Sequence, residues 1–254
     1  MKKSSLVSVF FATLFILSVF LYFFRPLGEN FYIIGDLIVI FLSFLAFLFC
    51  LHAYKFYGLK SLQGKAFLAI SVGIFFWFLG ETTWGIYEIV LGVEAPIGSL
   101  ADAFWLIGYP PFLFGLAYTL KISQAPIKKD RLILLAILTV FICSFLLYLA
   151  YPTLTSELSI LEKLSTSGYV VGDMLLLVFI MFATTNLLNA KIFKAYSLII
   201  IALTAMSIAD IYYTIFFEEY AVGNWIDLLW NLGYILLALG FFYHRETIKN
   251  LLKK

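Results

Sequence analysis

Acidic residues recur inside segments that are otherwise apolar. The six in question are Asp36, Glu81, Asp102, Asp173, Asp210 and Asp227. An ionised acid at the centre of a bilayer costs roughly 2.5–3.5 kcal/mol on insertion scales, so such residues normally face protein or water. Carboxyl groups there can bind a cation or a ligand rich in hydrogen-bond donors. We therefore predict that these six residues contribute to a ligand site.

Aromatic residues lie three or four positions away from these acids in the sequence. Residues at this spacing lie on the same face of a helix. The stripes are Trp77, Glu81, Trp84 and Glu88; then Asp102, Trp105 and Tyr109; then Asp227, Trp230 and Tyr234. We predict that all residues of these stripes except Glu88 line one pocket. Asp36, Asp173 and Asp210 are predicted to line the same pocket. All six acids fall in the outward halves of the expected helices, with Glu81 deepest.

Structural roles are the alternative for each acid. Ser99 to Asp102 and Asn224 to Asp227 have the spacing of a capping box, which stabilises a helix start without any further role. Glu81 and Asp210 are too deep to be caps, and protonated, hydrogen-bonded acids are the alternative there. Asp36 and Asp173 lie beyond the first turn, and both interpretations stay open for them.

The elements that must position these residues are membrane helices. Hydrophobic residues make up 63% of the 254 and charged residues 13%, against about 25% charged in a soluble domain, and the mean hydropathy is +1.02. Because about 20 apolar residues cross a bilayer, we predict an all-α protein of eight transmembrane helices. Their ranges are 6–24, 31–54, 66–91, 101–122, 131–151, 168–188, 195–217 and 225–243. We expect a multi-pass protein of the cell membrane, with no soluble domain and with the first helix retained.

Charge predicts the orientation of these helices. With a cytoplasmic N-terminus, 15 of the 17 basic residues fall in cytoplasmic segments, and only Arg25 and Lys163 do not. Positive residues favour the cytoplasmic side, so both termini are predicted there. The net charge of +2 and the lack of a basic run argue against a nucleic-acid partner.

The chain also contains an internal repeat. Segment 101–118, ADAFWLIGYPPFLFGLAY, and segment 226–243, IDLLWNLGYILLALGFFY, are identical at six positions. The run from Tyr32 to Asp36 likewise matches that from Tyr169 to Asp173. We predict two four-helix repeats, 1–122 and 131–254, in one integrated membrane domain. Since four is even, the repeats are parallel, with a pseudo-twofold axis along the membrane normal.

Glycine and proline shape the repeated segments. Gly108 and Gly115, like Gly233 and Gly240, lie seven residues apart on one face, which predicts close helix packing. Pro110 and Pro111 occur only in the first copy, and two prolines should kink that helix and free two carbonyl groups.

The sequence lacks the residues that several cofactors and enzyme classes require. No lysine lies within 195–217 or 225–243, so a retinal Schiff base is not favoured. His52 and His244 sit at predicted helix ends and are not repeat equivalents, so haem is not favoured either. No catalytic triad or zinc motif is present, so we expect no enzyme; the cofactor and any metal are unknown. Cys50 and Cys143 are expected to be packing residues.

One stretch resembles a known family. Residues 84–110 read WGIYEIVLGVEAPIGSLADAFWLIGYP, and Trp225 with 227–234 fits the same pattern. They resemble the N-terminal multi-helix membrane regions of some bacterial diguanylate cyclases and of some bacterial and archaeal sensor kinases. The resemblance implies a sensory input module. No output domain is expected after His244, so signal transduction would need a separate partner on the cytoplasmic side.

These observations lead to three function hypotheses. The first is a stand-alone membrane sensor or small-ligand-binding protein, with an outward-facing pocket between the repeats for a small molecule or cation. The alternative is a small secondary transporter or ion-coupled carrier, because parallel repeats and intramembrane acids also suit alternating access. An intramembrane enzyme has least support. Segments 6–24 and 131–151 carry no intramembrane acid and are expected to face the lipid bilayer.

Overall fold

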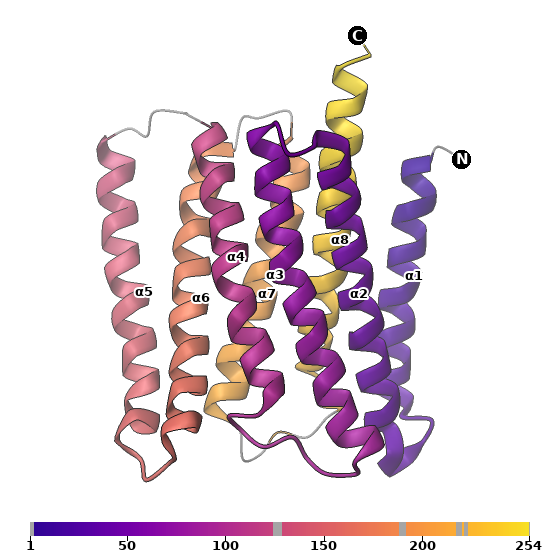
Figure 1. The fold of residues 1–254 in the computed structure, drawn as a ribbon, viewed down its shortest axis with the longest axis vertical. Coiled ribbons are helices and arrows are strands. Elements are labelled where there is room, and N and C mark those ends of the chain that lie inside the picture. The colour runs from indigo at the N-terminus through magenta and orange to yellow at the C-terminus, as the bar shows by residue number, and fades with distance from the viewer. Residues whose placement is uncertain (1–2, 124–128, 188–191, 217–219, 221–222, 254) are drawn as a thin grey trace.

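The computed structural model describes residues 3–123, 129–187, 192–216, 220 and 223–253. In these ranges the chain forms eight α-helices and no strand, and each helix runs opposite to the one before it (Figure 1). The helices are α1 (Lys3–Phe24), α2 (Phe31–Tyr57), α3 (Leu62–Gly85), α4 (Leu100–Ser123), α5 (Lys129–Thr155), α6 (Ile160–Leu187), α7 (Phe193–Ile215) and α8 (Asp227–Leu251). A 3-10 turn at Gly28–Asn30 precedes α2, and a π turn at Ile86–Val90 follows α3.

Most of these helices suit a bilayer. Of the described helices, α1, α2, α3, α4, α6 and α7 are long and apolar enough to cross a membrane. The apolar stretch described in α5 is shorter, Leu132–Tyr148, and α8 continues into a polar end with Arg245 and Lys249. The eight predicted helices therefore form, and six of them have the length and composition of a membrane span.

Two helices extend well beyond their predicted limits. The α6 helix begins at Ile160 rather than 168, because Ser159 and Glu162 cap its start. The Ser159 backbone N–H donates to Glu162 Oε2 at 2.7 Å, and the Glu162 N–H donates to Ser159 Oγ at 3.3 Å. Asp173 is consequently the fourteenth residue of α6, about 20 Å from its start at 1.5 Å per residue. The predicted start of this helix at 168 was wrong, and Asp173, expected beyond the first turn, lies further into the helix than that start implied. The α8 helix similarly continues past 243 to Leu251.

Six of the helices close a ring. Around it, α2 packs on α3, α3 on α4, α4 on α6, α6 on α7, α7 on α8, and α8 on α2. Outside the ring, α1 packs on α8 and α5 packs on α6, so these two helices lie at opposite edges of the bundle (Figure 1). The start of α1 and the end of α8 lie at the same end of the bundle (Figure 1).

Glycines bring neighbouring helices of the ring into close contact. A Cβ atom added to Gly115 would lie 2.3 Å from Ile70 Cγ1 of α3, and one on Gly240 would lie 2.6 Å from Ile199 Cγ1 of α7. Both distances are shorter than real contacts, so only glycine fits at this separation. The predicted close packing through these glycines is confirmed. The α4 helix meanwhile continues through Pro110 and Pro111 without ending.

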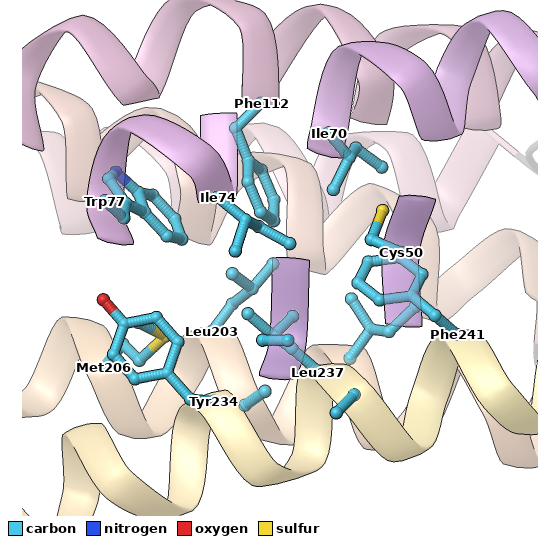
Figure 2. Packing of buried hydrophobic residues seen from close by; sticks show 14 of the residues in the cluster. Cys50, Ile70, Ile74, Trp77, Phe112, Leu203, Met206, Tyr234, Leu237 and Phe241 are labelled. Carbon is cyan, nitrogen blue, oxygen red and sulfur yellow. The ribbon is translucent and has the colours of Figure 1, made fainter. Parts of the chain in front are cut away.

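An apolar cluster with residues from all six helices of the ring fills part of its interior, and Figure 2 shows a portion of it. Its buried members include Cys50, Ile70, Ile74, Phe112, Leu203, Leu237 and Phe241. Cys50 is fully buried and packs there as predicted, with its thiol donating to the Phe67 carbonyl at 3.4 Å. Trp77, Met206 and Tyr234 lie together at one side of the cluster in Figure 2, where the apolar packing gives way to a polar cavity.

Candidate ligand-binding cavity

A cavity of about 110 Å³ lies inside the ring, in the half of the bundle away from the chain termini. Its acids are Asp36, Glu81, Asp173, Asp210 and Asp227. Its aromatic residues are Trp77, Trp84, Trp105, Trp230, Tyr22, Tyr109, Tyr169, Tyr213, Tyr220 and Tyr234, and the rest of the wall is Gly35, Val39, Leu176, Met206 and Thr214. The space holds several water molecules or a small ligand, since one water needs only about 10–15 Å³ measured in this way.

Eleven of the twelve residues predicted for the site line this one cavity, and Asp102 does not. Asp102 instead caps α4, because its Oδ2 accepts the Ser99 backbone N–H at 2.9 Å. Its other oxygen, Oδ1, accepts the Tyr169 hydroxyl at 2.6 Å. Asp102 therefore acts on the cavity through Tyr169, a wall residue.

The two deepest predicted acids are held by α8. The Tyr234 hydroxyl donates to Glu81 Oε1 at 2.6 Å, and the Trp230 indole N–H donates to Asp210 Oδ1 at 2.8 Å. Both carboxyl groups line the cavity and lie inside the ring rather than against lipid, as predicted.

Asp173 is held from two sides. Its Oδ1 accepts the Tyr109 hydroxyl from α4 at 3.1 Å and the Ser207 hydroxyl from α7 at 3.2 Å. A Cβ atom on the neighbouring Gly172 would lie 2.5 Å from the Tyr109 ring. The glycine thus allows the tyrosine to lie against α6 and reach the acid.

Asp227 is held by the segment before α8. Its carboxylate accepts the Gly223 N–H at 2.8 Å, the Tyr220 hydroxyl at 2.9 Å and the Tyr22 hydroxyl at 3.3 Å. Burial raises the pKa of Tyr220, so this hydroxyl stays protonated and donates. The predicted capping box was wrong in its partner, because Gly223 and not Asn224 donates to Asp227. The Asn224 side chain accepts from Ile226 instead.

Asp36 differs from the other wall acids. It is the sixth residue of α2 and only 2% exposed, yet its Oδ2 atom has no hydrogen-bond partner within the described part of the chain. Buried polar atoms are almost always paired. Asp36 therefore brings to the cavity wall a buried acceptor that the described protein groups do not use.

Among the described residues of the wall there is no cationic side chain. Arg25, which lies nearby, donates to the Gly223 carbonyl at 2.7 Å. No three His, Cys, Asp or Glu side chains among the described residues are placed to hold a metal ion. The arrangement can accept hydrogen bonds, present aromatic faces and stabilise positive charge.

Sequence reasoning missed several tyrosines of the wall. Tyr22 comes from α1, which was expected to face only lipid, and Tyr220 comes from the connection between α7 and α8. Neither position carries a periodic signal, because one ends a helix and the other lies between helices. Tyr169 had a signal, since it opens the repeated Tyr-x-x-Gly-Asp segment. No described residue of α5 reaches the cavity.

A second polar cluster lies at the opposite end of the bundle. His244 was expected at the interface but is only 1% exposed. Its Nδ1 pairs with the Tyr57 hydroxyl at 2.9 Å, and the rings of Phe67 and Tyr196 contact it edge-on. The α8 helix extends further than predicted, so the bundle covers this residue.

No family model, curated protein or solved structure matches this chain. The likeness of residues 84–110 to membrane sensor regions accordingly stays a prediction. Evidence on function therefore comes from the geometry and charge of the cavity.

Proposed function

We propose that this protein is a membrane sensor or binding protein that holds a small cationic or donor-rich ligand in the cavity. One observation carries the proposal: in the described part of the chain, five acids, four tryptophans and six tyrosines surround one space that no cationic side chain lines. Polar groups that converge on a concave, largely aromatic site are typical of small-molecule binding. Acids kept inside a membrane bundle usually serve function.

A duplicated architecture supports this proposal. Exchanging α2, α3 and α4 with α6, α7 and α8 turns each contact of the ring into another contact of the ring. Individual contacts repeat as well. A Cβ on Gly108 would meet Trp77, and one on Gly233 would meet Met206, the residue at the matching place in α7. We infer that the six-helix ring consists of two parallel copies related by a pseudo-twofold axis along the membrane normal.

The two remaining helices do not follow this exchange. The α1 helix packs on α8, but α5 packs on α6 rather than on α4. The pseudo-twofold relation that we propose therefore applies to the ring, and α1 and α5 are additions at its edges.

The orientation of the helices determines which side of the membrane the cavity lies nearer to. With cytoplasmic termini, as the distribution of basic residues favours, the cavity lies in the outward half of the bundle. The apolar cluster around Ile74, Leu203 and Leu237 then separates the cavity from the cytoplasm. Such a seal suits a sensor, in which bound ligand shifts the helix packing without crossing the membrane. The likeness of residues 84–110 to sensor input regions agrees with this role and with a separate signalling partner.

A secondary transporter is the alternative, favoured by the same exchange of helices. Parallel repeats that enclose a site can rock to expose it alternately to each side. A measurement of ligand flux across the membrane distinguishes a sensor from a transporter. A sensor binds its ligand in proteoliposomes without moving it, whereas a transporter accumulates it when a proton or sodium gradient is imposed.

The proposed site is tested by filling the cavity. Val39 lines it, whereas Val72 lies on an exposed face of α3, so Val39→Phe and Val72→Phe are a matched pair. Purified wild type and both variants are dialysed against a metabolite extract, and enriched small molecules are identified by mass spectrometry. We expect wild type and Val72→Phe to enrich a compound that Val39→Phe does not. Equal enrichment by all three, or none by wild type, would contradict the proposal.

A further inference from the structure

The acids of the cavity differ in how far protein donors already satisfy them. Glu81, Asp210 and Asp173 each accept at least one side-chain hydrogen bond, and Asp227 accepts three hydrogen bonds in all. Asp36 is as buried as Asp173, but its Oδ2 accepts none from the described residues. Among the wall acids, Asp36 is therefore the one with a fully buried oxygen that the described residues leave without a donor.

An unpaired carboxyl oxygen in such a place is costly. Leaving a buried acceptor unsatisfied costs about 1–3 kcal/mol, and more if the group is charged. A donor that enters the cavity and reaches Asp36 removes this cost. The gain is largest when the donor is itself charged, because charge-assisted hydrogen bonds are roughly twice as strong as neutral ones.

The charged groups around the cavity determine whether a cationic or an anionic ligand is favoured. The described residues of the wall supply five carboxyl groups and no cationic side chain, so an anionic ligand would meet like charges without compensation from them. A metal ion bound by the protein alone lacks the necessary cluster of three ligating side chains among the described residues. An organic cation fits better, because it can meet one acid while its carbon atoms contact the rest of the wall.

Aromatic rings supply that contact. The rings of Trp84 and Trp105 lie 5.7 Å apart, and the Tyr213 ring lies 6.4 Å from Trp84 and 6.2 Å from Trp230. All four residues line the cavity. Aromatic faces attract cations, tryptophan most strongly, and the attraction grows when the cation is desolvated.

We propose that the cavity binds a small organic ammonium ion that carries at least one N–H group. The N–H donates to Asp36, and the tryptophan rings contact the charge and its carbon substituents. This inference rests on the proposed function of the cavity and names the class of its ligand. It also names Asp36 as the acid that recognises the charge, ahead of the deeper Glu81 and Asp210.

Four probes test it by calorimetry on the purified full chain at neutral pH. Protonated ethanolamine has a charge and N–H groups, and choline has a charge without N–H. The alcohol 3,3-dimethyl-1-butanol is the neutral isostere of choline, and propionate is an anion. We expect ethanolamine to bind best, with choline weaker and the alcohol and propionate at least about tenfold weaker than ethanolamine.

Two variants connect the preference to Asp36. Asp36→Asn should weaken ethanolamine binding at least about tenfold. Glu162→Gln changes the carboxylate that caps the start of α6, outside the cavity wall, and should change ethanolamine binding by less than about threefold. Thermal unfolding verifies that each variant is folded. If Asp36→Asn does not fold, Trp84→Leu keeps the acid and should reduce the preference for ethanolamine over the alcohol.

The outcomes separate this inference from the proposed function. Equal binding of ethanolamine and the alcohol, or an Asp36→Asn variant that keeps full ethanolamine affinity, overturns the ammonium inference. No binding of either cation by wild type overturns it as well. In these cases the cavity remains a binding site if Val39→Phe still loses a metabolite that Val72→Phe retains, and fails as one if it does not.

Discussion

Asp36 and Asp173 occupy the same place in the two Tyr-x-x-Gly-Asp segments, and both are 2% exposed. Their surroundings nevertheless differ. Asp173 is held by hydroxyl groups from α4 and α7, whereas Oδ2 of Asp36 has no partner among the residues described. The comparison teaches that a motif can place an acid in a membrane bundle, while its neighbours decide whether the acid is structural or available.

The difference traces to Tyr109 and Tyr234, which hold the same position in segments 101–118 and 226–243. Tyr109 of α4 donates to Asp173 of α6. Its counterpart Tyr234 of α8 donates to Glu81 of α3 instead of Asp36 of α2. Because a hydroxyl donates only one hydrogen bond, this choice leaves Asp36 to other donors.

The largest effect should come from removing the satisfied acid. Asp173→Ala leaves the Tyr109 and Ser207 hydroxyls without their acceptor and opens a small void. We expect it to lower the free energy of unfolding by about 3 kcal/mol, because each buried unsatisfied group costs about 1–3 kcal/mol. Chemical unfolding in detergent, monitored by tryptophan fluorescence, measures the change. A loss no larger than that of Asp36→Ala would contradict the contrast between the two acids.

Ligand binding should respond to the deep acids next. If Glu81 meets the ligand as a carboxylate, Glu81→Gln should weaken binding by about 2 kcal/mol and leave the fold intact. If its role is structural, the same change should alter stability by about 1 kcal/mol and leave binding unchanged. Ligand-induced thermal stabilisation of the purified variant, with ethanolamine as the probe, distinguishes the two. Glu162→Gln, a change outside the cavity wall, is the control, and its main effect should be a looser start of α6.

The two tyrosines give a smaller and more direct test. Tyr109→Phe and Tyr234→Phe each remove one hydroxyl and should each lower the free energy of unfolding by about 1 kcal/mol, the usual net value of a hydrogen bond. Only Tyr234→Phe should also change ethanolamine binding, because it frees Glu81 to compete with Asp36 for the ligand. Matched unfolding and calorimetry on both variants provide the comparison. Equal binding changes in the two would mean that the two copies treat a ligand alike.

Much of the fold and of the cavity wall could be predicted from the sequence. Apolar runs of sufficient length predicted the helices, and the 3.6-residue period placed Glu81 with Trp77 and Trp84 on one face. Glycine spacing predicted the contacts of Gly115 and Gly240. These are local properties of a helix, and helix geometry alone turns them into structure.

Other features depend on tertiary geometry. The start of α6 is set by Ser159 and Glu162, which lie outside the apolar run that marks the membrane span. The Tyr220 hydroxyl donates to Asp227 from outside any helix, where no periodic pattern predicts the contact. No periodicity predicts whether Tyr234 donates to Glu81 or to Asp36, because that choice depends on the separation of three helices.

The smallest effect on stability, and the sharpest contrast with Asp173, should come from Asp36→Asn. The asparagine amide has nearly the same size as the carboxyl group and carries no charge, so it removes the cost of a buried acid without leaving a void. Since no described hydrogen bond to Oδ2 is lost, we expect the free energy of unfolding without ligand to rise by about 0–1 kcal/mol. Asp173→Asn should lower it instead, because a neutral amide oxygen accepts the Tyr109 and Ser207 hydroxyls less strongly than a carboxylate does, and the new NH2 group needs an acceptor of its own. Paired unfolding curves of the two variants at one pH measure the difference in sign. A clear loss of stability in Asp36→Asn would mean that a protein donor already holds this acid, and Asp36 would then be as structural as its counterpart.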